Sequence, residues 1–215
     1  MTGQEKASFC QILATHFYPP DQELVKLIHQ RTLYFFFEKY IQSWGGMEDL
    51  LKGFVMNGEF ENLLGDLRAE YGRLFSGLSE ESISLVESFY KPWTQDPGCF
   101  LPFASERGLL MGDSALHLLK IYHQCGLEIS EEFKGCPDHI AMELEFLSYL
   151  YRWATDLEVK QFIEDHLDWI SLLKEELKRF DPHPFYVSTL EILDLFLKRE
   201  KEKLEVEGNG EKKIH

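Results

Sequence analysis

The chain has 215 residues, of which 44% are hydrophobic and 27% are charged, a composition typical of globular proteins and unlike that of disordered ones. Its 37 acidic residues outnumber its 22 basic residues, so the net charge is −15 and no basic stripe runs along the sequence. We therefore exclude nucleic acid as a partner and expect the negative field to favour cationic ligands.

The N-terminal sequence and the spacing of the cysteines favour a cytoplasmic location. The first residues, MTGQEKASFC, contain an early acid and no apolar core, so they do not resemble a secretory signal peptide. The longest apolar runs, such as residues 33–37, fall far short of the roughly 20 residues that span a bilayer. The cysteines are widely separated, at Cys10, Cys99, Cys125 and Cys136. They form no CxxC pair, so we expect no metal and no cofactor. Because the chain also has neither a signal peptide nor a membrane-length apolar run, we expect no membrane insertion and a reducing, cytoplasmic location.

Apolar residues at three- and four-residue spacing predict helices along most of the chain. In order these helices cover residues 4–17, 21–42, 59–75, 105–126, 137–155, 157–180 and 184–204, with a short helix ending near Asn57–Gly58. Pro19–Pro20 interrupts the first pair, and Asp181-Pro182-His183-Pro184 separates the last pair. No alternating strand pattern, internal repeat or glycine-rich phosphate loop occurs, so the sequence predicts an all-α fold.

The helical pattern fails between Ser76 and about Pro102, where glycines and prolines alternate with aromatic residues. A long aromatic loop inside a compact protein is more often functional than idle. We treat residues 76–104 as a candidate hinge between two helical portions, although one shared core fits the pattern equally well. Residues 1–205 are expected to form one compact helical domain, followed by a polar, flexible tail over 206–215.

The segment Tyr71-Gly72-Arg73-Leu74-Phe75-Ser76-Gly77 ends one of the predicted helices. Its ordinary interpretation is structural, with Tyr71, Leu74 and Phe75 in the core and Gly77 as the C-terminal cap. Its functional interpretation is that these aromatic and aliphatic side chains form one wall of an apolar groove.

The segment that begins Cys136-Pro137-Asp138-His139 opens another predicted helix, with Pro137 in its first turn. His139 and Glu143 lie one turn apart, where they can pair. A metal-dependent hydrolase using Asp138, His139, Glu143 and Glu145 is one interpretation, but the segment lacks a second histidine at ligand spacing. The spacing favours a structural role, in which Asp138 caps the helix and His139 bonds to a neighbouring segment. His166, in the following helix, is expected to be a packed or surface histidine.

Four segments taken in order resemble the TorD/DmsD/NarJ family, the dedicated cytoplasmic chaperones of molybdenum-containing redox enzymes. They are YGRLFSG, ESFY, PDHIAMELEFLSYL, and FIEDHLDWISLLKEEL with the following FYVSTLEILDLFL. The resemblance extends over residues 5–200. It implies an all-helical fold of the TorD/DmsD type and a binding function without catalysis.

The resemblance also implies a partner and a mode of action. The chain would bind the N-terminal twin-arginine signal peptide of the catalytic subunit of a molybdopterin oxidoreductase and delay export until the cofactor is inserted. An acidic chain with an aromatic loop suits such a peptide, because arginine pairs with carboxylates and the apolar stretch gains burial energy. We expect the groove between residues 71–104 and the start of the 137–155 helix.

Seven residues fall on the peptide-binding positions that the resemblance implies: Tyr71, Leu74, Phe75, Ser88, Tyr90, Asp138 and His139. The sequence departs from the family pattern in two places. Leu85 and Val86 replace a proline and an aromatic residue of the loop motif, and Cys136 stands where many members have glutamate.

Other functions stay open beside this one. The client could be a nitrate-reductase-like subunit that is not exported, or the chain could be the metal-dependent hydrolase described above. A helical adaptor without a peptide groove is a third possibility. For the oligomeric state we expect a monomer or a dimer that exchanges segments through residues 76–104.

Overall fold

The computed structural model describes residues 1–55, 59–78 and 82–211, with side chains described as far as Leu204. The prediction of an all-α fold is confirmed, because the described residues form helices and no strand, apart from one isolated bridge between Val86 and His139. The chain divides into two compact units, each built from separate stretches. Unit 1 comprises Met1–Ala14 and Ser84–Leu173, and unit 2 comprises Thr15–Ile83 and Lys174–His215. One boundary between the units therefore lies within the predicted hinge.

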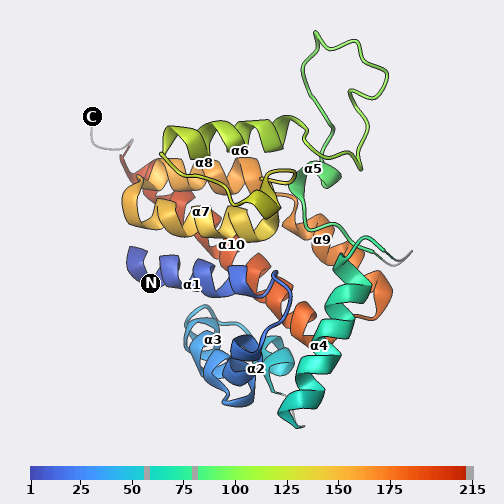
Figure 1. Ribbon diagram of the computed structural model, residues 1–215. Helices are drawn as coiled ribbons and strands as arrows, with labels where there is room; N and C mark the ends of the chain where they lie inside the picture. The colour runs from blue at the N-terminus through green and yellow to red at the C-terminus, as the bar shows by residue number, and fades with distance from the viewer. Residues whose placement is uncertain (56–58, 79–81, 212–215) are drawn as a thin grey trace. The chain divides into compact units, whose positions relative to one another are not determined.

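Unit 1 contains four of the residues predicted to bind the peptide, Ser88, Tyr90, Asp138 and His139. Its helices are α1 (Gly3–Thr15, ending at the boundary), α5 (Glu87–Tyr90), α6 (Asp113–Gln124), η2 (Glu131–Phe133), α7 (Ile140–Trp153), α8 (Asp156–His166) and the first half of α9 (Ile170–Leu177). The helices α6, α7 and α8 lie side by side (Figure 1) and together line one cavity.

Local signals explain where α7 and α8 form. Ile140, Leu144 and Leu147 give α7 a fully buried face at four- and three-residue spacing. Thr155 and Glu158 form a capping box at the start of α8, in which the Thr155 amide donates to Glu158 Oε2 at 2.8 Å. The region predicted as one helix over 157–180 contains two α-helices, α8 and α9, with a break between His166 and Ile170.

A long loop over residues 91–112 joins α5 to α6 and extends away from the start of α6 (Figure 1). Its two arms are paired, since the Trp93 amide donates to the Glu106 carbonyl at 2.9 Å and the Thr94 amide donates to the Ala104 carbonyl at 2.8 Å. The prediction that a helix begins at residue 105 is wrong. Positive φ angles of 82° at Gly108 and 58° at Met111 keep this stretch out of the helical region, so α6 begins only at Asp113.

Unit 2 contains α2 (Gln22–His29), α3 (Thr32–Ser43), η1 (Glu48–Phe54), α4 (Phe60–Phe75), the second half of α9, η3 (Lys178–Phe180) and α10 (Pro184–Glu211). The predicted helix 21–42 is interrupted at Arg31, whose φ of 57° is left-handed. The short helix η1 packs closely on the start of α10, where the Gly53 amide donates to Ser188 Oγ at 2.9 Å.

Unit 2 contains a fully buried histidine, His16, packed among aromatic rings. The His16 ring is surrounded by Phe37, Phe54 and Phe185, with ring centroids 5.0–5.8 Å away. Its Nδ1 lies 3.1 Å from Thr189 Oγ1. Burial lowers the pKa of His16 from 6.5 to about 3, so the imidazole is neutral at neutral pH.

Helix α10 continues to Glu211, whereas residues 212–215 of the predicted tail, like Asn57–Gly58, lie outside the described residues. The flexible tail therefore stays a prediction. None of the described helices combines the length and the apolar character needed to cross a membrane.

Candidate functional site

The start of α7 differs from the prediction in a way that defines the site. Pro137 lies in a turn, and the first helical residue is Ile140. His139 is the N-terminal cap, because its Nδ1 accepts a hydrogen bond from the Ala141 amide at 3.2 Å. The predictions that the helix begins at Pro137 and that Asp138 caps it are therefore wrong. Burial lowers the pKa of His139 to about 4, which keeps this cap neutral.

Asp138 instead holds the segment that precedes and forms α5. Its Oδ2 accepts a hydrogen bond from the Ser88 amide at 2.7 Å, and its carbonyl accepts one from the Glu87 amide at 2.9 Å. The Ile140 amide donates in turn to the Leu85 carbonyl at 2.9 Å. Asp138 and Ser88 are fully buried, and burial raises the pKa of Asp138. The Asp138 carboxylate therefore positions a neighbouring segment and does not face solvent.

The structure brings four of the seven predicted site residues together in unit 1. Ser88 is bonded to Asp138, and Asp138 precedes the cap residue His139. The Tyr90 hydroxyl donates to the Ser84 carbonyl at 2.9 Å. The Tyr90 ring stacks on Trp169 with centroids 5.1 Å apart. Of these four, only His139 is more than marginally exposed.

The other three predicted residues lie at the end of α4 in unit 2. Leu74 is fully buried, whereas Tyr71 and Phe75 are partly exposed, with ring centroids 5.3 Å apart. The Tyr71 hydroxyl donates to the Phe17 carbonyl at 3.2 Å, and burial raises the pKa of Tyr71 to about 12. The groove expected between residues of different units stays a prediction.

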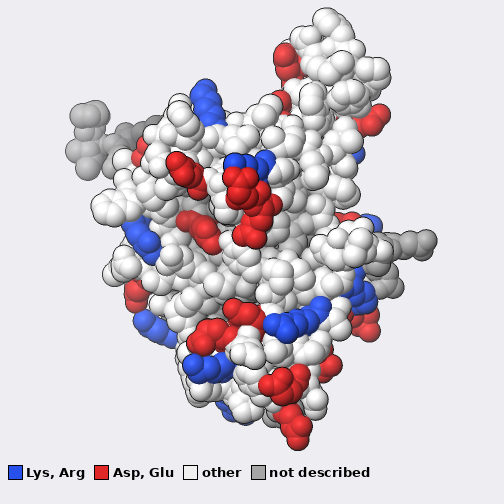
Figure 2. Space-filling view, viewed as in Figure 1, with Lys and Arg blue, Asp and Glu red and all other residues white. Residues whose placement is uncertain are grey.

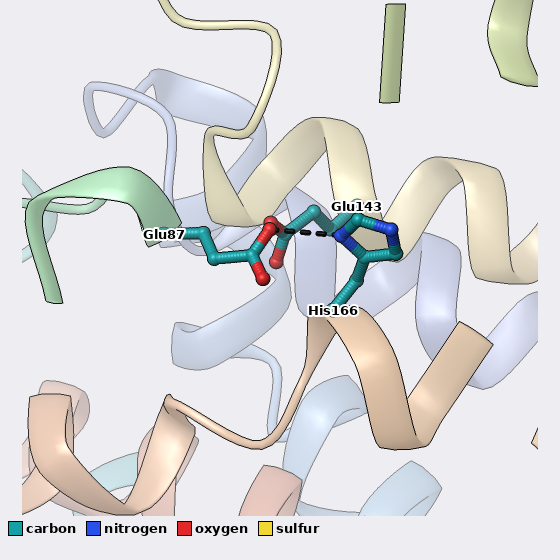
Figure 3. A group of neighbouring side chains, drawn as sticks. All are labelled: Glu87, Glu143 and His166. Atoms are coloured by element: carbon teal, nitrogen blue, oxygen red, sulfur yellow. Dashed lines mark hydrogen bonds and ion pairs between the residues drawn. The ribbon is translucent and has the colours of Figure 1, made fainter. Parts of the chain in front are cut away.

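A buried cluster of Glu87, Glu143 and His166 lies beside Asp138 in unit 1, and its side chains converge from three helices (Figure 3). His166 Nδ1 lies 2.9 Å from Glu87 Oε2, and Trp169 Nε1 donates to Glu143 Oε2 at 3.1 Å. Our sequence reasoning missed Glu87. The available signal was a lone acid set between Val86 and the aromatic pair Phe89–Tyr90.

A neighbouring lysine, Lys91, supplies a positive charge next to this cluster. Burial, followed by the nearby charge of Glu87, raises the pKa of Glu143 well above 4.5, which favours the neutral form of this carboxyl group. Lys91 Nζ lies 2.6 Å from Glu87 Oε1 and 2.6 Å from Asp168 Oδ1. Burial alone would lower the pKa of Lys91, but these two carboxylates outweigh it and raise the pKa. Lys91 therefore already supplies the cation that Glu87 requires.

The four residues of the hydrolase interpretation do not converge. Among the described residues, the only group of three or more potential metal ligands is Glu87, Glu143 and His166. Glu143 alone belongs to both sets. Glu145 is exposed and lines a cavity that none of the other three residues lines. The Nδ1 atom of His139 already accepts the hydrogen bond from the Ala141 amide.

His166 connects the buried cluster to the surface. Its Nε2 lies 2.8 Å from Nδ1 of the exposed His117, and the two rings stack with centroids 4.9 Å apart. Burial, followed by the neighbouring His166, lowers the pKa of His117. Across the face shown in Figure 2, acidic side chains are dispersed with Lys and Arg among them, and its described residues form no continuous basic patch.

Comparison with known proteins gives a family match over much of the chain. The model of the family described as nitrate reductase delta subunit matches residues 38–181, about two thirds of the 215 residues. The related proteins below are each named chaperone protein TorD. The protein of Vibrio parahaemolyticus is 34% identical over 114 residues, covering 46% of this chain and 53% of the relative.

Two further relatives match with lower identity. The protein of Shewanella piezotolerans is 24% identical over 129 residues, which cover 59% of this chain and 57% of the relative. The protein of Salmonella paratyphi B is 28% identical over 102 residues, which cover 43% of this chain and 47% of the relative. The chain thus spans about half the length of the curated relatives it matches.

Proposed function

The chain belongs to the nitrate reductase delta subunit family, to which the TorD/DmsD/NarJ chaperones belong, and from this premise we propose that it is an assembly chaperone for a molybdopterin-containing oxidoreductase. The observation that carries the proposal is the family match over residues 38–181. The name shared by the curated relatives, chaperone protein TorD, supports it.

We propose further that the chain acts in the cytoplasm. There it binds the N-terminal twin-arginine signal peptide of the catalytic subunit and delays export until the cofactor is inserted. The net charge of −15 supports a cationic ligand. Exposed carboxylates beside apolar side chains suit a peptide whose arginines precede an apolar stretch, because each part of the peptide then has a complementary surface.

The seven predicted site residues would contribute in two ways. Tyr71, Phe75 and His139 are partly exposed, so they are proposed to contact the peptide. Ser88 and Asp138 are fully buried, so they are proposed to act by holding the residues around α5 in place. Leu74 and Tyr90 are buried and would support the same surfaces from within.

The proposal assigns binding to this chain and no catalysis. Two buried carboxylates of unit 1, Glu87 and Glu143, have structural partners. Glu143 accepts a hydrogen bond from Trp169, and Glu87 is paired with Lys91 and His166.

A second candidate client follows from the family's description. A nitrate-reductase-like subunit that stays in the cytoplasm would have no functional twin-arginine signal, and its chaperone would recognise another N-terminal segment. The match to the nitrate reductase delta subunit family favours keeping this alternative.

Calorimetric titration with N-terminal peptides of the molybdopterin-enzyme catalytic subunits from the source genome tests the proposal. Each peptide is also titrated with its arginine pair replaced by alanine. We expect one peptide to bind with a Kd in the micromolar range, about −8 kcal/mol, and to bind at least about tenfold more weakly without its arginines. Selective binding that is indifferent to the arginines would favour the second client. Failure of every peptide would contradict the proposed function.

A further inference from the structure

Two neighbouring cavities in unit 1 share the stacked pair His117 and His166 together with Asp165. The first has a volume of about 260 Å³ and is walled by apolar side chains of α6, α7 and α8, namely Ile121, Phe146, Leu150 and Phe162. The second has a volume of about 310 Å³ and lies between the loop after α5, the start of α6 and the end of α8. We call the two together the His117–His166 groove.

Acidic side chains border both parts of this groove. Asp165 lies in the shared wall, is exposed, and has no hydrogen bond or ion pair to its carboxylate among the described residues. Glu158 lies at the apolar cavity, and Asp113 lies at the other. Asp113 Oδ2 accepts hydrogen bonds from Thr94 Oγ1 and the Gln95 amide, and no lysine or arginine among the described residues forms an ion pair with it.

Lys91, which lines the second cavity, does not balance these acids. Lys91 Nζ is already held between Glu87 and Asp168, each at 2.6 Å. The groove therefore combines an apolar cavity that accepts a large side chain with carboxylates that form no ion pair with another described residue. Carboxylates in this position form charge-assisted hydrogen bonds with an arginine or lysine side chain.

We propose that the His117–His166 groove binds a client segment in which a cationic side chain is next to large apolar ones. An apolar side chain of the segment enters the cavity lined by Phe146 and Phe162, and the cationic side chain pairs with Asp165. This inference rests on the proposed function for its occupant, a segment of the client protein. It adds a contact surface that the seven predicted site residues do not include.

The groove is also joined to Asp138 through a short series of contacts. His117 bonds to His166 at 2.8 Å, and His166 bonds to Glu87 Oε2 at 2.9 Å. The Glu87 amide donates to the Asp138 carbonyl at 2.9 Å. Asp138 therefore borders the groove only indirectly: its backbone carbonyl holds the amide of Glu87, and the Glu87 carboxylate holds His166.

The decisive comparison uses two substitutions on α8 that each remove one negative charge. Asp165→Asn changes the groove, whereas Glu164→Gln changes the adjacent exposed acid, which lines neither cavity and lies 3.8 Å from Lys160. The full-length variants are titrated with the tightest-binding N-terminal peptide of the panel described above. We expect the Kd to rise about tenfold for Asp165→Asn, the equivalent of about 1.4 kcal/mol, and by less than about twofold for Glu164→Gln.

A second pair of variants tests the apolar cavity on α6. Ile121→Ser removes an apolar lining side chain, whereas Leu116→Ser changes a side chain that is 53% exposed and lines neither cavity. Only Ile121→Ser is expected to weaken binding, again by about tenfold, since the apolar part of the peptide loses a buried contact. Unfolding temperatures of all four variants show whether a loss of binding reflects a loss of fold.

The outcomes separate the inference from the proposed function. If wild-type protein binds a peptide but Asp165→Asn and Glu164→Gln behave alike, the groove is not the contact surface, although the chaperone function stands. If wild-type protein binds no peptide, the proposed function fails and the groove loses its occupant. Weakening by Asp165→Asn and Ile121→Ser alone supports the inference.

Discussion

The carboxylate of Asp138 is fully buried and accepts the Ser88 amide hydrogen bond at 2.7 Å. Asp138→Ala would leave that buried amide without an acceptor, which costs about 1–3 kcal/mol. Asp138→Asn keeps a carbonyl oxygen in place, and it removes a charge that burial already disfavours. We therefore expect Asp138→Ala to lower the free energy of unfolding in urea at pH 7 and Asp138→Asn to lower it less. Equal stability of both variants and the wild type would contradict this role.

His16 should make unit 2 sensitive to acid. Its pKa is about 3 in the folded protein and 6.5 in the unfolded chain, so the unfolded state binds more protons between these values. The stability that the neutral ring provides is complete above pH 6.5 and is lost as the pH falls toward 3. At about 1.36 kcal/mol per pH unit, roughly 3 kcal/mol is lost between pH 6.5 and pH 4.

The matched measurement is urea unfolding of the wild type and His16→Gln between pH 4 and pH 7. The pKa values of Asp138 and Glu143 are raised in the folded protein, so these two groups make the protein more stable as the pH falls. The contribution of His16 is therefore given by the difference in unfolding free energy between the wild type and His16→Gln. We expect the wild type to lose stability more steeply with acid than the variant. Parallel curves would show that the imidazole titrates normally in the folded protein.

At the scale of elements, the contact between η1 and α10 depends on a glycine. A Cβ atom at Gly53 would lie 2.2 Å from the Pro184 carbonyl oxygen and 2.7 Å from Ser188 Oγ, distances that force the backbone apart. Gly53→Ala should therefore destabilise the protein by about 3 kcal/mol, at the upper end of overpacking effects.

Gly65 within α4 provides the control, since a Cβ atom there meets nothing within 4 Å. Gly65→Ala should raise stability by about 0.5–1 kcal/mol through helix propensity. Thermal unfolding of both variants checks the pair. Similar midpoints for the two variants would mean that η1 and α10 do not pack as closely as the structure indicates.

The elements also show how far sequence reasoning reaches. Apolar spacing identified the regions that become α4 and α7, because each buries one face. It could not place the breaks at Arg31 and Met111, since left-handed backbone at residues other than glycine has no strong local signal. The start of α8 did have a local sequence signal, because Thr155 and Glu158 have the spacing of a capping box.

The candidate site was harder to predict than the helices. The family resemblance identified Asp138, His139 and Ser88, which lie together in the structure. Local spacing then assigned the cap to Asp138, whereas His139 makes it. The contact between Glu87 and His166 joins residues 79 positions apart, and neither helical periodicity nor motif spacing encodes such a pairing.

At the scale of the molecule, the chain passes between its two units at Ala14/Thr15, Ile83/Ser84 and Leu173/Lys174. The His117–His166 groove and the contacts of Asp138 belong wholly to unit 1. The proposed binding surface is therefore described within a single compact unit. Exchange of segments through residues 76–104, which would produce a dimer, stays a prediction.

Hydrogen–deuterium exchange of the full-length protein, with and without the tightest-binding N-terminal peptide, tests the central claim most directly. Occupation of the groove should slow exchange in α6 and α8, over residues 113–124 and 156–166, because bound peptide stabilises the helices that line it. Amides of α2 and α3, which line neither cavity, serve as the internal reference. Slower exchange in α6 and α8 is the predicted result. Unchanged exchange in both helices at saturating peptide would contradict it.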